Sequence, residues 1–205
     1  MLPPEVTVSI AALLAVLVMM LAELKRSRAN ERALRQRGAI EPPGDVYRAM
    51  AIVYPAIFIV MAMEGLATGP APTAALIAGF VTFTAAKLLK LWAITALGPR
   101  WSYRVLVLRD VPLVTGGPYA RLRHPNYVAV FGEIAGFALM VGARISGVIS
   151  LLAFAALVRK RIAVEEKAPS AGRGVMQAGP NRSAIGPQTS DNPQPIKNNA
   201  KSRPP

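Results

Sequence analysis

Five apolar stretches, separated by polar connections, run along most of the chain. They occupy residues 6–22, 46–66, 73–97, 128–143 and 146–158. A helix needs about 17–25 apolar residues to cross the hydrocarbon core of a bilayer, and the first three stretches meet this length. The last two are shorter and only a few residues apart, which predicts a tight helical hairpin. The pattern predicts an all-α, polytopic membrane protein with about five transmembrane helices and a C-terminal helical hairpin.

The Lys and Arg residues are concentrated in alternate connections. Residues 25–48 carry seven, residues 98–127 carry five and the segment from Arg159 carries nine. By contrast, residues 66–72 carry none and the turn around Arg144 carries one. Because cytoplasmic loops hold the excess of basic residues, the N-terminus is predicted to lie outside and the C-terminus in the cytoplasm.

The composition supports a membrane protein and excludes several kinds of site. Hydrophobic residues make up 53% of the 205 residues and charged residues only 17%, which is too apolar for a typical soluble protein. No cysteine and a single histidine leave no thiolate site, no cysteine nucleophile and no His-rich metal site, so we expect no metal. The net charge of +13 lies between apolar stretches rather than on a separate basic module, so we expect no nucleic-acid partner.

The connection at residues 98–127 is too elaborate for a bare link and is the main candidate for chemistry. His124-Pro125 is predicted to open the fourth helix, because proline suits the first helical position. With Arg121 and Arg123 beside it, this helix N-terminus forms a seat for a carboxylate or phosphate. For the arginines alone, a positive-inside boundary is the simpler explanation.

Two tyrosines flank this helix start. Tyr119 follows a Gly-Gly-Pro turn at residues 116–118, and Tyr127 lies in the first helical turn. They are either aromatic residues of the membrane interface or residues that flank an adenine and face a cation.

A few ionisable and small residues fall inside the apolar stretches. Lys87 and Lys90, one helical turn apart, are expected to extend to the lipid headgroups. Glu133 is costly to bury, so it is either functional or a structural partner of Lys87, Lys90 or an arginine. Gly132 and Gly136 form a small-xxx-small pair that predicts close helix packing.

The end of the fifth stretch carries a second charged motif, with Arg161 and Glu165 four residues apart on one helix face. A surface salt bridge is one interpretation. In the other, the hairpin returns this segment to the side of His124, so that an anion-binding arginine and an amine-binding glutamate share one pocket.

Together these motifs resemble the isoprenylcysteine carboxyl methyltransferase (ICMT) family and its bacterial relatives. The resemblance rests on Gly-Pro-Tyr at 117–119, Arg-His-Pro-Asn-Tyr at 123–127, the helical hairpin, and Arg161 followed by Glu-Glu at 165–166. It covers roughly residues 98–166. Members of this family are integral membrane enzymes that use S-adenosylmethionine, so the resemblance implies a cytoplasmic cofactor pocket in a bacterial inner or plasma membrane.

The resemblance also implies roles for individual residues. The residues implied to line the S-adenosylmethionine pocket are Leu113, Val114, Tyr119, His124, Pro125, Asn126 and Tyr127. Glu165 is implied to hold the cofactor, and Arg161 to be catalytic by pointing at the acceptor. The expected reaction is O-methylation of a carboxylate or hydroxyl on a lipophilic, isoprenoid- or polyketide-like acceptor that enters from the bilayer.

Three regions follow from these predictions. Residues 1–97 form an N-terminal three-helix membrane region, residues 98–167 the methyltransferase region, and residues 168–205 a disordered tail rich in Pro, Gly, Ser and Asn. The alternative functions are a phospholipid N-methyltransferase, which the Arg161 charge disfavours, and a non-enzymatic scaffold whose basic loops bind anionic membrane lipids. A transporter is a minor alternative, because no internal repeat is visible.

Overall fold

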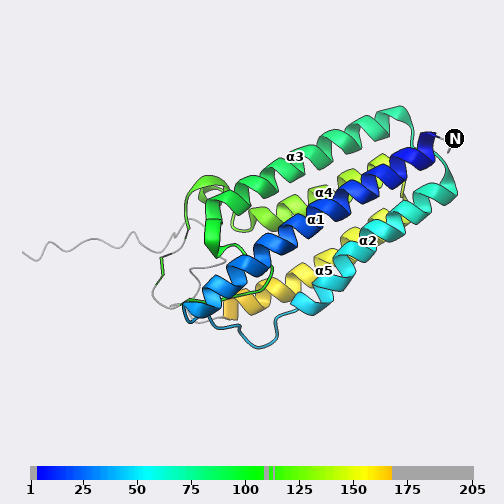
Figure 1. Cartoon of the computed structure of the whole chain (residues 1–205). Helices are drawn as coiled ribbons and strands as arrows, with labels where there is room; N and C mark the ends of the chain where they lie inside the picture. The colour runs from blue at the N-terminus through cyan, green and yellow to red at the C-terminus, as the bar shows by residue number, and fades with distance from the viewer. Residues whose placement is uncertain (1–3, 109–110, 113, 168–205) are drawn as a thin grey trace, which may run out of the picture.

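A computed structural model describes residues 4–108, 111–112 and 114–167. Within these residues the chain forms α1 (Pro4–Gln36), α2 (Tyr47–Thr68), α3 (Thr73–Leu97), α4 (Pro125–Val141) and α5 (Ile145–Lys167), with short 3-10 helices η1 (Gly98–Arg100) and η2 (Gly117–Ala120). The five long helices lie side by side in an elongated bundle (Figure 1). The beginning of α1 and the α2–α3 turn are at one end, and the connection between α3 and α4 is at the other.

The helices confirm the all-α, polytopic membrane fold predicted from the sequence. Segments Val6–Gln36, Tyr47–Thr68 and Thr73–Arg100 are long and apolar enough to span a membrane. The other two helices are shorter or more charged: α4 is apolar but has 17 residues, and α5 becomes charged near its C-terminal end. The predicted disordered tail, residues 168–205, lies outside the described residues.

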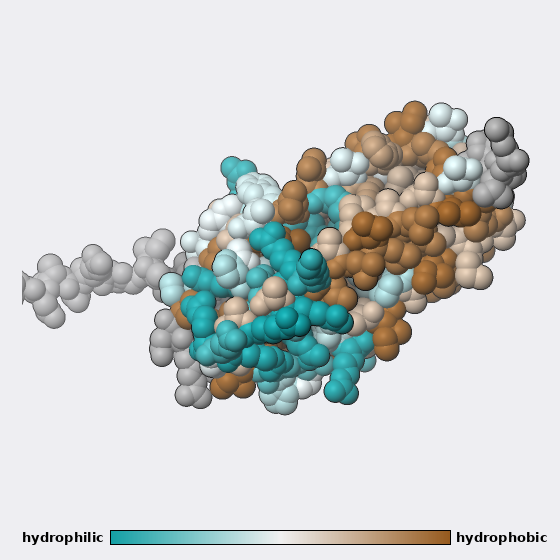
Figure 2. All heavy atoms as spheres, in the orientation of Figure 1, coloured by the Kyte–Doolittle hydropathy of each residue, from teal (hydrophilic) through white to brown (hydrophobic). Residues whose placement is uncertain are grey.

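The first helix is longer than its apolar stretch predicts. α1 continues past residue 22 as far as Gln36 through a polar segment rich in Ala, Leu, Glu and Arg, which are strong helix formers. Ser27 and Leu34 in this extension are buried, so it packs against the rest of the protein. Most of the basic residues assigned to the first loop therefore lie on a helix. Hydrophilic residues cover the end of the bundle where α1 ends, and hydrophobic residues cover much of the rest of its length (Figure 2).

Glycines bring α3 and α4 unusually close together. A Cβ atom added at Gly136 would lie 2.5 Å from the backbone nitrogen of Phe83, and one at Gly79 would lie 2.6 Å from the carbonyl oxygen of Gly136. A Cβ atom at Gly132 would lie 2.8 Å from the Ala86 side chain. The small-residue pair on α4 therefore serves close helix packing, as predicted.

Gly136→Ala should destabilise the protein, because a methyl group would collide with the backbone of α3, which cannot move aside alone. Overpacking of this kind costs about 1–3 kcal/mol, so we expect the thermal unfolding midpoint in detergent to fall by several degrees. Gly116→Ala is the matched control, since its added Cβ would meet nothing within 4 Å. Equal midpoints for the two variants would show that α3 and α4 separate easily.

Contacts at both ends of the bundle join segments that are distant in sequence. At the α4–α5 turn, Glu64 of α2 accepts hydrogen bonds from the backbone N–H groups of Ile145 (2.9 Å) and Ser146 (2.6 Å), which caps α5. α5 then runs back toward the start of α4. At the opposite end, Ile40 pairs with Val107 in an isolated antiparallel bridge, which ties the α1–α2 connection to the segment after α3.

Candidate functional site

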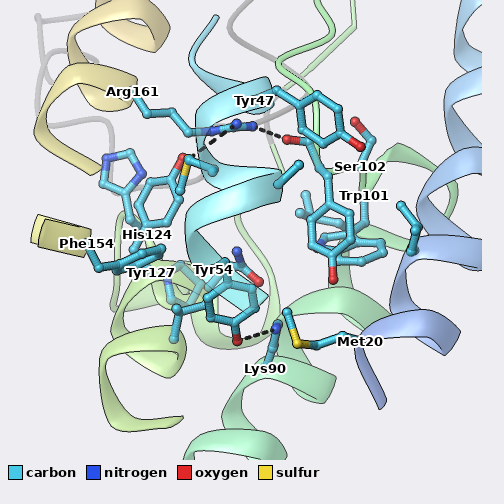
Figure 3. Close-up of a pocket in the computed structure, with 18 of the residues that line it drawn as sticks. Met20, Tyr47, Tyr54, Lys90, Trp101, Ser102, His124, Tyr127, Phe154 and Arg161 are labelled. Atoms are coloured by element: carbon cyan, nitrogen blue, oxygen red, sulfur yellow. Dashed lines mark hydrogen bonds between the residues drawn. The ribbon is translucent and has the colours of Figure 1, made fainter. Parts of the chain in front are cut away.

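A cavity of about 530 Å³ lies at the end of the bundle where α3 ends and α4 begins, with walls from all five helices. Seven residues that the sequence predicted for the site line it: Tyr119, His124, Pro125, Asn126, Tyr127, Arg161 and Glu165. The hairpin explains this convergence, because α4 leaves the cavity and α5 returns to it. Figure 3 shows Arg161, His124 and Tyr127 around the same space.

The other two predicted residues have different positions. Val114 is partly buried and packs against the cluster that contains Trp101 and Tyr119. It therefore supports Tyr119 and, among the described residues, is not part of the cavity lining. Leu113 lies outside the described residues.

Glu165 is the centre of a buried polar cluster. Its Oε1 atom accepts hydrogen bonds from the Tyr127 hydroxyl at 2.5 Å and from Arg161 Nε at 3.3 Å. Its Oε2 atom is 3.6 Å from His124 Nδ1, too long for a hydrogen bond. Oε2 accepts no hydrogen bond from the described residues, so this buried oxygen can accept one from a ligand in the cavity.

A second buried oxygen lies close by, at the start of α4. Asn126 Oδ1 is buried, and within the described part of the chain it has no hydrogen-bond partner. Leaving a buried acceptor unsatisfied costs about 1–3 kcal/mol. Because Asn126 lines the cavity, a ligand with an N–H or O–H donor would remove this cost.

Arg161 is held by protein groups from three segments. Its Nη2 atom donates to the backbone carbonyl of Tyr103 at 2.6 Å, Nη1 is 3.3 Å from Asp45 Oδ1, and Nε bonds to Glu165. Arg161 and Glu165 are both buried, so the surface salt bridge considered from the sequence is not what the structure contains. The predicted catalytic role of Arg161 toward an acceptor stays a prediction.

Asp45 is a site residue that the sequence motifs did not reveal. Besides its ion pair with Arg161, it accepts the backbone N–H groups of Tyr47 at 3.1 Å and Val105 at 3.0 Å. It thus joins the α1–α2 connection to the segment after α3 and to α5. An aspartate in a short polar connection is common, and nothing in its spacing from residues 161–165 indicates this contact.

Aromatic side chains line much of the remaining wall. The rings of His124 and Tyr127 are stacked with centroids 5.4 Å apart, and those of Trp101 and Tyr103 lie 5.1 Å apart. Burial and the nearby Glu165 carboxylate raise the pKa of Tyr119, and burial and Glu23 raise the pKa of Tyr103. Both hydroxyls are therefore protonated at neutral pH, and that of Tyr103 donates a hydrogen bond to Glu23 at 2.7 Å.

Four ion-paired side chains lie at the membrane-facing end of the cavity: Glu23 of α1, Lys87 and Lys90 of α3, and Glu133 of α4. Lys87 is 3.1 Å from one oxygen of each glutamate. Lys90 is 2.6 Å from Glu23 and 3.4 Å from Glu133. The Tyr54 hydroxyl of α2 donates a hydrogen bond to Glu133.

These four side chains, here called the ionic quartet, correct the prediction for the two lysines and decide the role of Glu133. Lys87 and Lys90 do not extend to the headgroups, because their side chains are only 15% and 1% exposed and point to carboxylates inside the bundle. Glu133 is the structural partner of both lysines. The charged residues inside the apolar stretches indicated that buried ion pairs exist. Sequence spacing alone did not show that Glu23 of α1 takes part in them.

The region that carries both motifs is similar to a known protein family. Residues 75–170 match the sequence model of the isoprenylcysteine carboxyl methyltransferase (ICMT) family, which confirms the resemblance drawn from the motifs. An uncharacterized protein, YpbQ of Bacillus subtilis (strain 168), is 29% identical over 157 residues, covering 76% of this chain and 94% of the relative. No solved structure shows significant similarity to the chain.

Proposed function

Because residues 75–170 of this chain match the sequence model of the isoprenylcysteine carboxyl methyltransferase family, we propose that the protein is an S-adenosylmethionine-dependent O-methyltransferase. Family membership and the helical fold together support a multi-pass membrane methyltransferase. The acceptor we propose is a carboxylate or hydroxyl of a lipophilic, isoprenoid- or polyketide-like molecule. The observation that carries the proposal is the convergence of two separate motifs, residues 123–127 and 161–165, on one cavity.

The cavity suits the proposed cofactor in size and in chemistry. Its volume of about 530 Å³ falls within the range of small-molecule pockets, about 300–1,000 Å³. The Glu165 and Asn126 oxygens would accept hydrogen bonds from the cofactor's amine, and the positive end of α4 would stabilise its carboxylate. Tyr119 and Trp101 supply aromatic surface for the adenine or the sulfonium.

Catalysis in such a site depends mainly on positioning and on exclusion of water. Bound S-adenosylmethionine supplies a methyl group attached to a positively charged sulfur. The protein's own contribution is to keep Glu165 fixed through Tyr127 and Arg161 and to surround the cavity with buried aromatic rings. No side chain needs to remove a proton when the acceptor is a carboxylate.

The acceptor would reach the cavity from the bilayer. Leu17, Met20 and Leu21 of α1 and Ala51 and Pro55 of α2 line an apolar part of the wall. Leu21 is 64% exposed on the surface of the bundle, so this wall extends to the region that lipid chains would cover. With the N-terminus outside, as the distribution of basic residues predicts, the motif end of the cavity would face the cytoplasm.

Calorimetric binding of S-adenosylhomocysteine to the purified full chain in detergent tests the proposal. We expect micromolar affinity that Tyr119→Ala weakens strongly, because this ring is buried in the cavity wall. Absence of binding by folded protein, together with salt-sensitive binding to anionic liposomes, would overturn the proposal and favour the lipid-binding scaffold. If binding occurs, a radiolabelled methyl group that appears on a phospholipid amine would favour the N-methyltransferase instead.

A further inference from the structure

Lys90 is the member of the ionic quartet that faces the cavity. Its side chain is 1% exposed to solvent and lines the cavity, whereas the other three quartet residues are not among the lining side chains of the described chain. Figure 3 shows Lys90 and Arg161 at opposite ends of the cavity, with Met20 and Tyr54 beside Lys90. A buried ammonium is expensive unless it is paired, and Glu23 and Glu133 meet this requirement, but the pairing alone does not require Lys90 to line the cavity as well.

The proposed reaction itself favours an anionic acceptor. The buried cations of the cavity wall are already paired, Lys90 with Glu23 and Glu133, and Arg161 with Asp45 and Glu165. The proposed cofactor adds a positive sulfonium. An acceptor that brings a negative charge would be attracted to this sulfonium, whereas a protonated amine would be repelled by it.

We propose that the Lys90 ammonium binds the reacting oxygen of the acceptor, so that the acceptors are lipophilic molecules with an ionised oxygen: a carboxylate, an enolate or a phenolate. This inference rests on the proposed methyltransferase function and narrows its substrate class. It assigns an acceptor-binding role to a residue of α3, separate from the two motifs.

The geometry of the quartet leaves Lys90 able to bind another oxygen. Its bond to Glu23 is short, at 2.6 Å, but its distances to the Tyr54 hydroxyl and to Glu133 are both 3.4 Å, which is longer than a normal N–H···O bond. One N–H can therefore turn toward a ligand at small cost. Glu133 would remain neutralised by Lys87 at 3.1 Å and hydrogen-bonded by Tyr54.

The surroundings of Lys90 also fit a lipophilic molecule with one polar end. Leu17, Met20 and Leu21 of α1 lie along the same part of the cavity and provide an apolar path toward the outside of the bundle. With its oxyanion at Lys90, the acceptor would extend its chain along this path. An enol or phenol gives its proton to water on ionisation. The oxygen's electron pair then forms the O–C bond, while the pair of the broken C–S bond stays on sulfur.

A chromogenic phenol tests this role without requiring methyl transfer. The probe is an ortho-nitrophenol with a para-dodecyl chain, bound to the full chain in lipid nanodiscs and titrated by absorbance against nanodiscs without protein. A cation within about 4–6 Å lowers the pKa of an acid by about 1–3 units, so the bound probe should ionise at lower pH than the probe in lipid. In Lys90→Met, we expect the pKa of the bound probe to rise by about the same amount.

Lys87→Met is the matched control, because it removes an equal charge from the same quartet but from a side chain that does not line the cavity. We expect it to move the probe pKa by less than half as much, and Lys90→Arg to keep the pKa low. Glu23, Tyr54 and Glu133, which face Lys90 from α1, α2 and α4, are unchanged in all three variants.

Equal pKa values for the probe in wild type and Lys90→Met, or equal shifts in the two Met variants, would overturn the inference. So would the absence of saturable, protein-dependent probe ionisation in wild type. If Lys90→Met does not fold, the pKa of the probe bound to Lys90→Arg is compared with that in the wild type. A raised probe pKa in the folded Arg variant would also contradict the inference. S-adenosylhomocysteine calorimetry on the same samples separates failure of this inference from failure of the proposed function.

Discussion

Glu165→Gln is expected to weaken S-adenosylhomocysteine binding by about 10- to 100-fold and to reduce methyl transfer at least as much. The substitution keeps the shape of the side chain but removes its charge. A hydrogen bond to a charged group contributes about 1.5–3 kcal/mol, and Oε2 is the buried oxygen that would face the cofactor's amine. Calorimetry of the variant and the wild type measures the change directly.

Glu64→Gln is the matched control for this experiment. It makes the same carboxylate-to-amide change at the opposite end of α5, where Glu64 accepts the N–H groups of Ile145 and Ser146. We expect a small loss of stability from the weaker cap and unchanged affinity for the cofactor product. Equal affinity losses in the two variants would indicate that Glu165 acts only by stabilising α5.

Arg161→Lys is expected to lower kcat/KM by about 100-fold, although it keeps the positive charge. The guanidinium joins Tyr103, Asp45 and Glu165 through separate nitrogens, and one ammonium cannot reach all three. Loss of these bonds would displace Glu165 and release the connection that carries Asp45. Steady-state methyl transfer at varied cofactor and acceptor concentrations checks this result.

Arg159→Lys provides the comparison for Arg161→Lys, because Arg159 lies on the same helix but is exposed. Its kcat/KM should match that of the wild type. If Arg161→Lys also retains full kcat/KM while folded, the three-way contact does not position the site.

The fold could be predicted well from hydropathy, except where helices continue into polar sequence. Three of the five helices begin and end within a few residues of their apolar stretches, whereas α5 continues past residue 158 as far as Lys167. α1 also continues past its apolar stretch, because its polar half is held by helix propensity and by the buried Ser27 and Leu34 rather than by lipid. Apolar length alone carries no information about such a continuation.

The site could be predicted where its residues are close in sequence. His124 to Tyr127 share one helix start, and Arg161 and Glu165 share one helix face, so local spacing and the hairpin were sufficient to bring them together. Lys90 in the cavity wall and Asp45, which pairs with Arg161, could not be found in this way. Their placement depends on how α1, α2 and the connection between them pack against residues 75–170, and a single sequence contains no periodic signal for contacts of such long range.

The cavity wall is divided between two stretches of sequence, and this division affects how the enzyme can diversify. The motif residues are in α4, α5 and the connection before them, all within residues 75–170, whereas α1 and α2 precede this region. Substitutions at Leu17, Met20 or Leu21 would reshape the path for an apolar chain without touching the motifs. Relatives that inherit the same motif residues could thus differ in the proposed lipophilic acceptor through mutations in the first two helices.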